Sequence, residues 1–178
     1  MKTWKKVLAS LAAVPVLAGA AFAGTPEHGA PVRPNAGFEA MKPLVGGWQG
    51  DSSEGKPVTV SYALVSDGSA LVETIGAGTD HEMVTVYYPD GDRLMMTHYC
   101  SLHNQPRMRA NAPAAGSGKL AFDFVDATNL PSPDAMHMHR LVVTLQDRDH
   151  FTQEWTWKNG EKEGTVVFRL ERKRDKAP

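Results

Sequence analysis

Residues 83–100 have the sequence MVTVYYPDGDRLMMTHYC, in which two apolar and aromatic segments flank a turn-forming sequence. Met83–Tyr88 and Arg93–Cys100 are rich in β-branched, aromatic and other large side chains that suit a pleated sheet. Between them, Pro89–Asp92 contains an Asp-Gly pair, and a short Asp-Gly turn between two such segments is typical of a β-hairpin. This stretch therefore predicts two adjacent antiparallel strands.

The same alternation of strand segments and short turns extends over most of the 178-residue chain. Tightly connected strands must pair antiparallel, and eight to ten of them in one domain are most simply closed into an up-and-down β-barrel, which leaves no exposed edges. A two-sheet sandwich is the alternative, since the longer connection 127–135 allows a crossing between sheets. Besides 83–88 and 93–100, the expected strands are a first strand after Gly46 and the segments 59–65, 70–75, 119–126, 136–146, 150–158 and 165–172.

The N-terminus has the pattern of a secretory signal peptide. Three lysines precede an apolar run over 7–18 that is too short to span a membrane, and Ala21-Phe22-Ala23 is typical of a cleavage site. We expect cleavage after Ala23, a disordered leader over 24–37 with three prolines, and a single β-barrel domain over 38–174. The mature protein would then be soluble, either periplasmic or secreted.

Charge and cysteine content narrow the classes of partner. Removal of residues 1–23 takes away three of the 19 Lys and Arg and none of the 20 Asp and Glu, which leaves a net charge of −4. Nucleic acid and anionic membrane surfaces both require clustered positive charge, so neither is expected as a partner. Cys100 is the single cysteine, so an internal disulfide is impossible and a buried thiol is expected.

Two resemblances to known families bear on the fold. Gly46-Gly47-Trp48 resembles the Gly-x-Trp motif that begins the first strand of lipocalin and fatty-acid-binding (calycin) barrels. In those barrels a basic residue of the last strand packs over the tryptophan, which implies such a role for Arg169 or Arg172 here. The segments 97–108 and 153–157 are similar to an uncharacterised family of secreted bacterial domains. Eight strands would favour a lipocalin-like cavity, and ten a fatty-acid-binding-like one.

Candidate site residues gather in two segments. The first, 97–108, contains Cys100 and two of the seven histidines, and a second histidine pair follows about 35 residues later. Side chains alternate across a strand, so Leu94, Met96, His98 and Cys100 share one face. By the same count, a regular strand would place His137 and His139 on the inward face with Leu141, Val143 and Leu145, whereas a bulge would reverse this assignment.

These observations favour an exported β-barrel that binds a small amphipathic molecule in its interior, with binding favoured over catalysis. A barrel of this size has room for side chains or one small ligand, and a mixture of imidazole, thiol and aromatic groups suits a ligand that is apolar with a polar end. The expected ligand-binding residues are Met96, His98, Cys100, His137, His139, Trp155 and Trp157.

A metal site is the main alternative, because imidazole and thiolate are preferred ligands of zinc and copper. A zinc or copper carrier, or a metalloenzyme, would use His98, Cys100, His103, His137 and His139. Cys100-x-x-His103-x-x-x-x-Met108 also resembles the copper loop of cupredoxins, although that family has the loop near its C-terminus.

Three further hypotheses have less support. The start of the first strand resembles the Gly-x-Trp-x-Gly motif of nitrobindin-like haem barrels, but their axial histidine near the C-terminus has no counterpart after His150. An envelope interaction module with a packed interior is possible without any ligand. A catalytic acid/base set at the barrel mouth would use Glu73, Asp80, His81 and Glu82.

Overall fold

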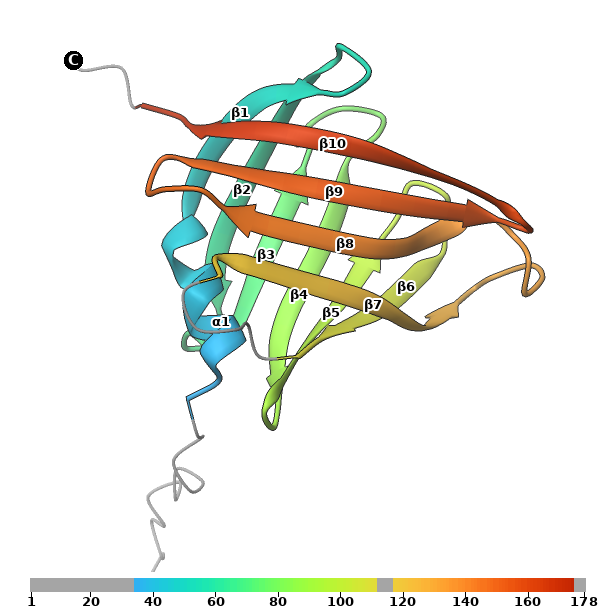
Figure 1. Ribbon diagram of the computed structural model, residues 1–178, viewed down its shortest axis with the longest axis horizontal. Helices are drawn as coiled ribbons and strands as arrows, with labels where there is room; N and C mark the ends of the chain where they lie inside the picture. Colours follow the sequence, from blue (N-terminus) through green and yellow to red (C-terminus); the bar gives the residue numbers. More distant parts are fainter. Residues whose placement is uncertain (1–33, 112–116, 175–178) are drawn as a thin grey trace, which may run out of the picture. The chain divides into compact units, whose positions relative to one another are not determined.

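The computed structural model describes residues 34–111 and 117–174, and within them ten strands form one closed antiparallel barrel (Figure 1). Each strand pairs with its neighbours in sequence, and the last pairs with the first. The predicted up-and-down barrel is confirmed, with ten strands, and the sandwich alternative is excluded. The strands are β1 (Gly46–Ser52), β2 (Pro57–Val65), β3 (Ala70–Ile75), β4 (Met83–Asp90), β5 (Arg93–Tyr99), β6 (Gln105–Ala110), β7 (Lys119–Thr128), β8 (His137–Leu145), β9 (His150–Asn159) and β10 (Lys162–Arg172).

The predicted signal peptide lies outside the described residues, as does most of the expected leader. The last residues assigned to that leader, 34–37, are described, and a helix capped by Asn35 begins at Ala36. No helix within the described parts of the chain is long and apolar enough to cross a membrane.

Turn chemistry accounts for the hairpins. Gly91 follows β4 with a φ of 64°, and Gly160 follows β9 with a φ of 60°, which is backbone that glycine adopts without steric cost. The hairpin at residues 83–100 pairs Asp90 with Arg93 at its tip, as its sequence predicted. The shortest connections therefore set the register of the barrel.

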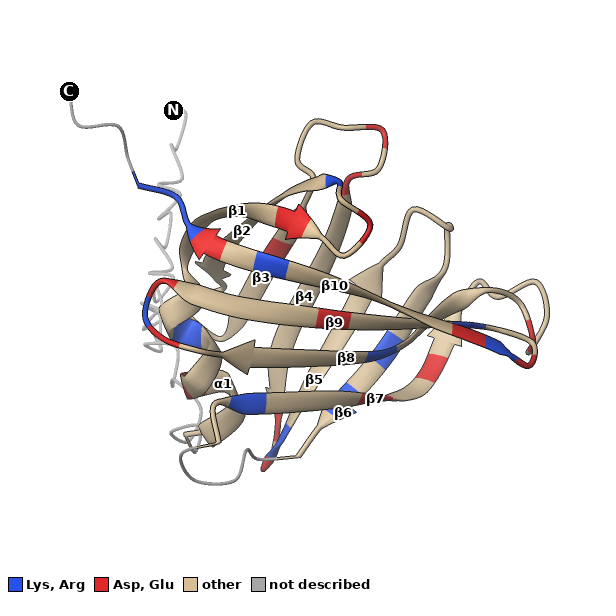
Figure 2. Cartoon of the chain, turned by 45° about the horizontal axis from the view of Figure 1, so that its top comes forward, with Lys and Arg blue, Asp and Glu red and all other residues tan. Residues whose placement is uncertain are grey.

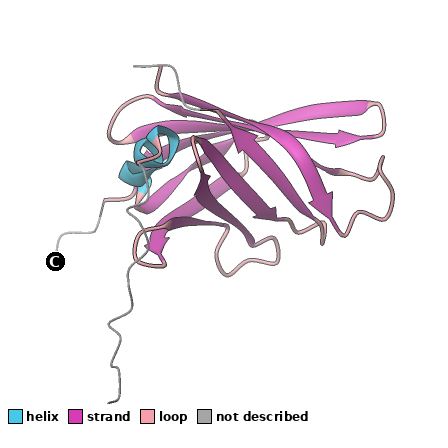
Figure 3. Cartoon of the chain, turned by 90° about the horizontal axis from the view of Figure 1, so that it is seen from below, coloured by secondary structure: helices cyan, strands magenta, loops and turns pink. Residues whose placement is uncertain are grey.

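A short helix closes one end of the barrel (Figures 1 and 3). Helix α1 (Ala36–Met41) continues into a 3₁₀ turn, η1 (Lys42–Leu44), and buries Phe38, Met41 and Leu44. Asn35 caps α1 by accepting a hydrogen bond from the Phe38 N–H at 2.9 Å, and its amide donates to the Gly91 and Arg93 carbonyl oxygens at 3.1 and 2.9 Å. This capping residue therefore fastens the helix to the β4–β5 turn.

The barrel closes where β1 meets β10, and an aromatic–cation pair covers this closure. The Arg172 guanidinium carbon lies 4.2 Å from the centroid of the Trp48 ring, which is itself 1% exposed. Arg172 also donates to the carbonyl oxygens of Pro43 and Val45 at 2.8 and 3.1 Å. The predicted packing of a basic residue over Trp48 is confirmed for Arg172, whereas Arg169 is exposed.

Replacement of Arg172 by lysine is expected to lower the free energy of unfolding by about 1–2 kcal/mol. A single ammonium group cannot lie over Trp48 and also donate to the carbonyl oxygens of both Pro43 and Val45. Arg169→Lys is the matched control, with an expected change within about 0.5 kcal/mol because the side chain is exposed. Urea unfolding of the two variants measures the difference, and equal effects would contradict the role given to Arg172.

The core occupies the half of the barrel next to α1. Inward residues alternate along each strand, and large side chains such as Tyr87, Phe122 and Phe151 are fully buried there. On the ribbon, basic and acidic positions are interspersed (Figure 2). The opposite end of the barrel is less tightly filled and contains a cavity.

Candidate functional site

A cavity of about 560 Å³ lies at the end of the barrel away from α1. Ile75 at the end of β3 and Met83 at the start of β4 line it, whereas α1 lies against the turn that follows the other end of β4. Most of the wall is apolar, and the polar residues lie mainly near the strand ends. The lining comprises Val58, Ile75, Met83, Met138, Trp155, Val166 and Phe168 with His98, and also Ser52, Glu54, Lys56, Pro57, Thr59, Gly76, Thr79 and His81.

His98 is the most deeply buried polar residue that lines this cavity. It is 1% exposed, and its Nδ1 lies 2.9 Å from the hydroxyl oxygen of Thr85 on the paired strand. Its Nε2 has no hydrogen-bond partner among the described residues. The ring packs against Trp155 with centroids 4.7 Å apart. Burial lowers the pKa of His98 to about 4, so the imidazole is neutral at pH 7.

A buried polar network continues from His98 and Trp155 into the barrel. The Glu73 carboxyl group is fully buried and accepts hydrogen bonds from the hydroxyls of Tyr62 at 2.5 Å and Tyr87 at 3.1 Å, and from the Gln153 amide. The Gln153 side-chain oxygen accepts from Trp155 Nε1 at 3.1 Å. Each donor is therefore matched by an acceptor, as a buried network requires.

Burial sets the direction of the pKa shifts in this network. It raises the pKa of Glu73, while the hydrogen bonds from Tyr62, Gln153, Thr85 and Tyr87 act in the opposite direction. It also raises the pKa values of Tyr62 and Tyr87, and the nearby Glu73 carboxyl adds to both shifts. The two phenols thus remain protonated donors at neutral pH.

A β-bulge corrects the expected orientation of His137 and His139. In β8, Met138 pairs with Trp157 and Arg140 with Thr156, so His139 is an additional residue and the alternation reverses there. Met138 consequently lines the barrel cavity, and neither histidine does. The strand is therefore not regular as far back as His137, and the alternative of a bulge that reverses the assignment is the one observed.

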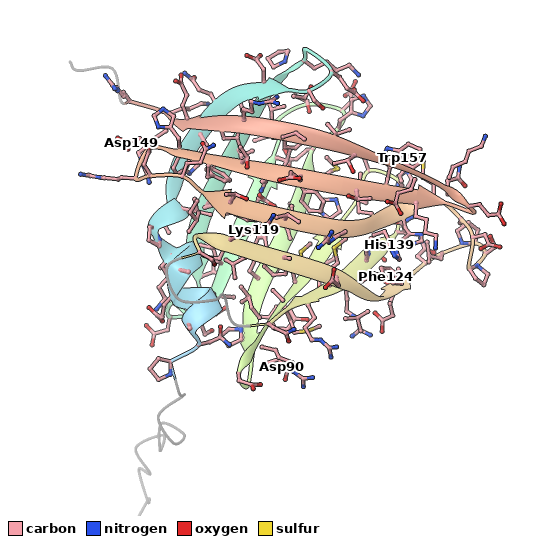
Figure 4. The ribbon with its side chains drawn as sticks, viewed as in Figure 1. Asp90, Lys119, Phe124, His139, Asp149 and Trp157 are labelled. Atoms are coloured by element: carbon pink, nitrogen blue, oxygen red, sulfur yellow. The ribbon has the colours of Figure 1, made fainter. Side chains whose placement is uncertain are left out.

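His137 and His139 instead lie at the seam where β7 and β8 separate. The pairing of β7 with β8 ends at Asp123 and Arg140. Both histidines line a separate pocket of about 200 Å³. His139 stacks on Phe124 with ring centroids 5.0 Å apart, and the two side chains lie together in Figure 4. Burial lowers the pKa of His139, and the neighbouring His137 and Lys158 lower it further.

The other predicted residues divide between core, turn and strand end. Met96 is fully buried opposite Met108 in the packed core. Cys100 directly follows β5 and is also buried, and this burial raises the pKa of its thiol. His103 is exposed in the β5–β6 turn, where its φ is 63°. The Cys100–Met108 segment thus forms a hairpin, and the metal ligands expected in it lie in different surroundings.

Of the seven expected ligand-binding residues, His98 and Trp155 line the barrel cavity. Trp157 pairs with Gly164 and covers it, since a Cβ at Gly164 would lie 2.5 Å from the indole ring. Among residues 34–111 and 117–174, no group of three or more His, Cys, Asp or Glu side chains is arranged to hold a metal ion. The structure therefore does not bring the five proposed metal ligands together.

Glu73 and Gln153, which belong to the buried polar network next to His98, were not assigned to the pocket from the sequence. Glu73 was placed at the barrel mouth, but it lies between the inward residues Leu71 and Ile75 of β3 and is buried. Gln153 likewise alternates with Phe151 and Trp155 on β9. Strand parity was the signal that could have identified both.

Comparison with known protein families and with curated proteins finds no match to this chain. The site is therefore interpreted from its own geometry.

Proposed function

We propose that this protein is an exported calycin-type barrel that binds one small, largely apolar molecule in the cavity above His98. The observation that carries the proposal is a buried imidazole nitrogen without a protein partner in a cavity with mainly apolar walls. Such a wall with one or a few placed polar groups is the usual form of a small-molecule site. The Trp48–Arg172 pair at the barrel closure supports the calycin assignment.

The volume also supports a ligand of modest size. About 560 Å³ lies within the range of small-molecule pockets, and the packed core next to α1 limits how deeply a ligand can enter. Export is part of the proposal and is supported by the sequence of residues 1–23. N-terminal sequencing of the mature protein tests cleavage after Ala23.

Native mass spectrometry with elemental analysis is the direct test of occupancy. The protein should be purified from the exporting compartment without chelator, and an organic adduct in a metal-free protein is the expected result. One equivalent of zinc or copper would contradict the proposal in favour of a metal protein. Failure to find an adduct, together with no binding of the dye described below, would favour an interaction module with a packed interior.

Filling the cavity is expected to weaken binding of the neutral apolar dye N-phenyl-1-naphthylamine by at least about tenfold. Val166 on β10 lines the cavity, so Val166→Trp places an indole in the space that the dye would occupy. Val167→Trp is the matched control, because the neighbouring residue does not line the cavity. Fluorescence titration measures both affinities, and equal affinities would show that the dye binds elsewhere.

A further inference from the structure

We propose that the molecule held in the cavity presents a hydrogen-bond donor, a hydroxyl or N–H group, to Nε2 of His98. The inference rests on the proposed function and specifies the chemistry of the ligand's buried end. It derives from the direction of the hydrogen bonds in the buried network next to His98. Their direction leaves Nε2 of His98 as a hydrogen-bond acceptor. An apolar alcohol, phenol or amine fits such a site, whereas a carboxylate at that end does not.

The network begins at an acceptor. Glu73 offers carboxyl oxygens, and the groups bonded to them in the structure are donors: the hydroxyls of Tyr62 and Tyr87 and the amide of Gln153. The Gln153 amide nitrogen also donates to the Tyr62 oxygen at 2.8 Å, which leaves the Tyr62 proton for Glu73. The hydrogen bonds around this carboxyl group therefore all run toward it.

Thr85 connects this network to His98, and its single hydroxyl proton decides which group donates in the contact between them. Thr85 is the direct cross-strand partner of Glu73 in the pairing of β3 with β4, and both residues are fully buried. The Thr85 side chain also acts to lower the pKa of Glu73, as a hydroxyl directed toward that carboxyl group does. A hydroxyl has one proton, so the Thr85 oxygen is then the acceptor in its 2.9 Å contact with His98 Nδ1. The proton of the neutral imidazole thus resides on Nδ1.

A neutral imidazole carries one ring proton, so Nε2 holds a lone pair. This atom is buried and lacks a partner among the described residues, and its side chain lines the cavity. A donor on the ligand would satisfy it, whereas an ether oxygen would leave it unsatisfied. A ligand carboxylate has no proton to donate, so it would leave the lone pair unsatisfied and would itself be desolvated beside it.

The tautomer can be measured without any ligand. A long-range ¹H–¹⁵N correlation spectrum of the labelled full-length protein at pH 7 shows which His98 nitrogen bears the proton, and assignment uses the His98→Phe variant. We expect the proton on Nδ1. A proton on Nε2 would overturn the inference whatever the cavity binds. In Thr85→Val, which removes the acceptor of the Nδ1 proton while keeping the side-chain shape, we expect the Nδ1-protonated form to lose its predominance.

Three probes of similar shape test the ligand chemistry by isothermal titration calorimetry: 2-naphthol, 2-methoxynaphthalene and 2-naphthoate. We expect 2-naphthol to bind at least about tenfold more tightly than the ether or the carboxylate. In His98→Phe, the naphthol-to-ether affinity ratio is expected to fall to about one. A fourth probe, 2-naphthylamine, separates N–H from O–H donors, and its preference over the ether would support the inference equally.

The outcomes distinguish this inference from the proposed function. Equal binding of 2-naphthol and its ether to the unmodified protein would overturn the donor requirement while supporting a small-molecule site. Preference for 2-naphthoate would overturn it as well. Binding of none of the probes, with the dye also unbound, would overturn the proposed function and the inference together.

Discussion

Gly50→Ala is expected to lower the free energy of unfolding by at least about 3 kcal/mol, enough to leave a marginally stable barrel largely unfolded. Gly50 pairs with Leu170 where β1 meets β10, and a Cβ placed there would lie 1.8 Å from the carbonyl oxygen of Arg169. The obstructing atom belongs to the backbone, so no side-chain rotation relieves the overlap. The two strands would have to separate at the closure of the barrel.

Gly47→Ala provides a matched control on the same strand. A Cβ at Gly47 would meet the Lys173 side chain at 3.3 Å, and this flexible chain can move aside by a few tenths of an ångström. Its expected cost is within about 1 kcal/mol. Thermal and urea unfolding of the two variants measure the contrast. A fully folded Gly50→Ala protein with unchanged stability would show that β1 and β10 pair less closely than in the structure.

The fold was predictable because the decisive signals are local. The turn after β4 joins strands that are adjacent in sequence, and Gly91 supplies the positive φ that such a turn requires. Repetition of short hairpins makes the antiparallel meander the simplest topology, and closure follows from the need to pair both edges. The number of strands was harder to predict than the topology, because Pro106 and two arginines weaken the strand pattern of β6.

The candidate site was predictable where strands remain regular. The inward face shared by Leu94, Met96 and His98 is confirmed by their burial. The bulge at His139 is a property of the pairing between β8 and β9, so the sequence of β8 alone does not determine it. Because of this shift of one residue, Met138 lines the cavity in place of the two histidines that a regular strand would have put there. A methionine at position 138 was already an unusual residue for a solvent-facing position.

The stability of the barrel is expected to fall by about 3 kcal/mol between about pH 6.5 and pH 4 because of His98 alone. Burial lowers its pKa in the folded protein to about 4, whereas in the unfolded chain it titrates near its ordinary value of 6.5. Above pH 6.5 both states hold the neutral ring, so the stability is fully present. Between the two values the unfolded chain binds a proton that the folded protein does not, and unfolding is favoured.

Glu73 contributes in the opposite direction and must be separated from His98. Its folded-state pKa is raised by burial, so the folded protein takes up a proton at a higher pH than the unfolded chain and gains stability as the pH falls. The Glu73 and His98 contributions together therefore give a shallower profile than His98 alone. In Glu73→Gln this opposing titration is absent, and the loss of stability toward pH 4 is expected to be steeper.

Subtraction of the His98→Phe profile isolates the imidazole. Urea unfolding followed by tryptophan fluorescence, at closely spaced pH values from 7 to 4, gives the free energy of unfolding of each variant. The difference between the unmodified protein and His98→Phe should change by about 3 kcal/mol over this window, flatten toward pH 7 and become less steep as the pH approaches 4. Parallel profiles would mean that the ring takes up its proton equally well in both states. The imidazole would then be reached by water, and its Nε2 would not be a desolvated acceptor awaiting a ligand.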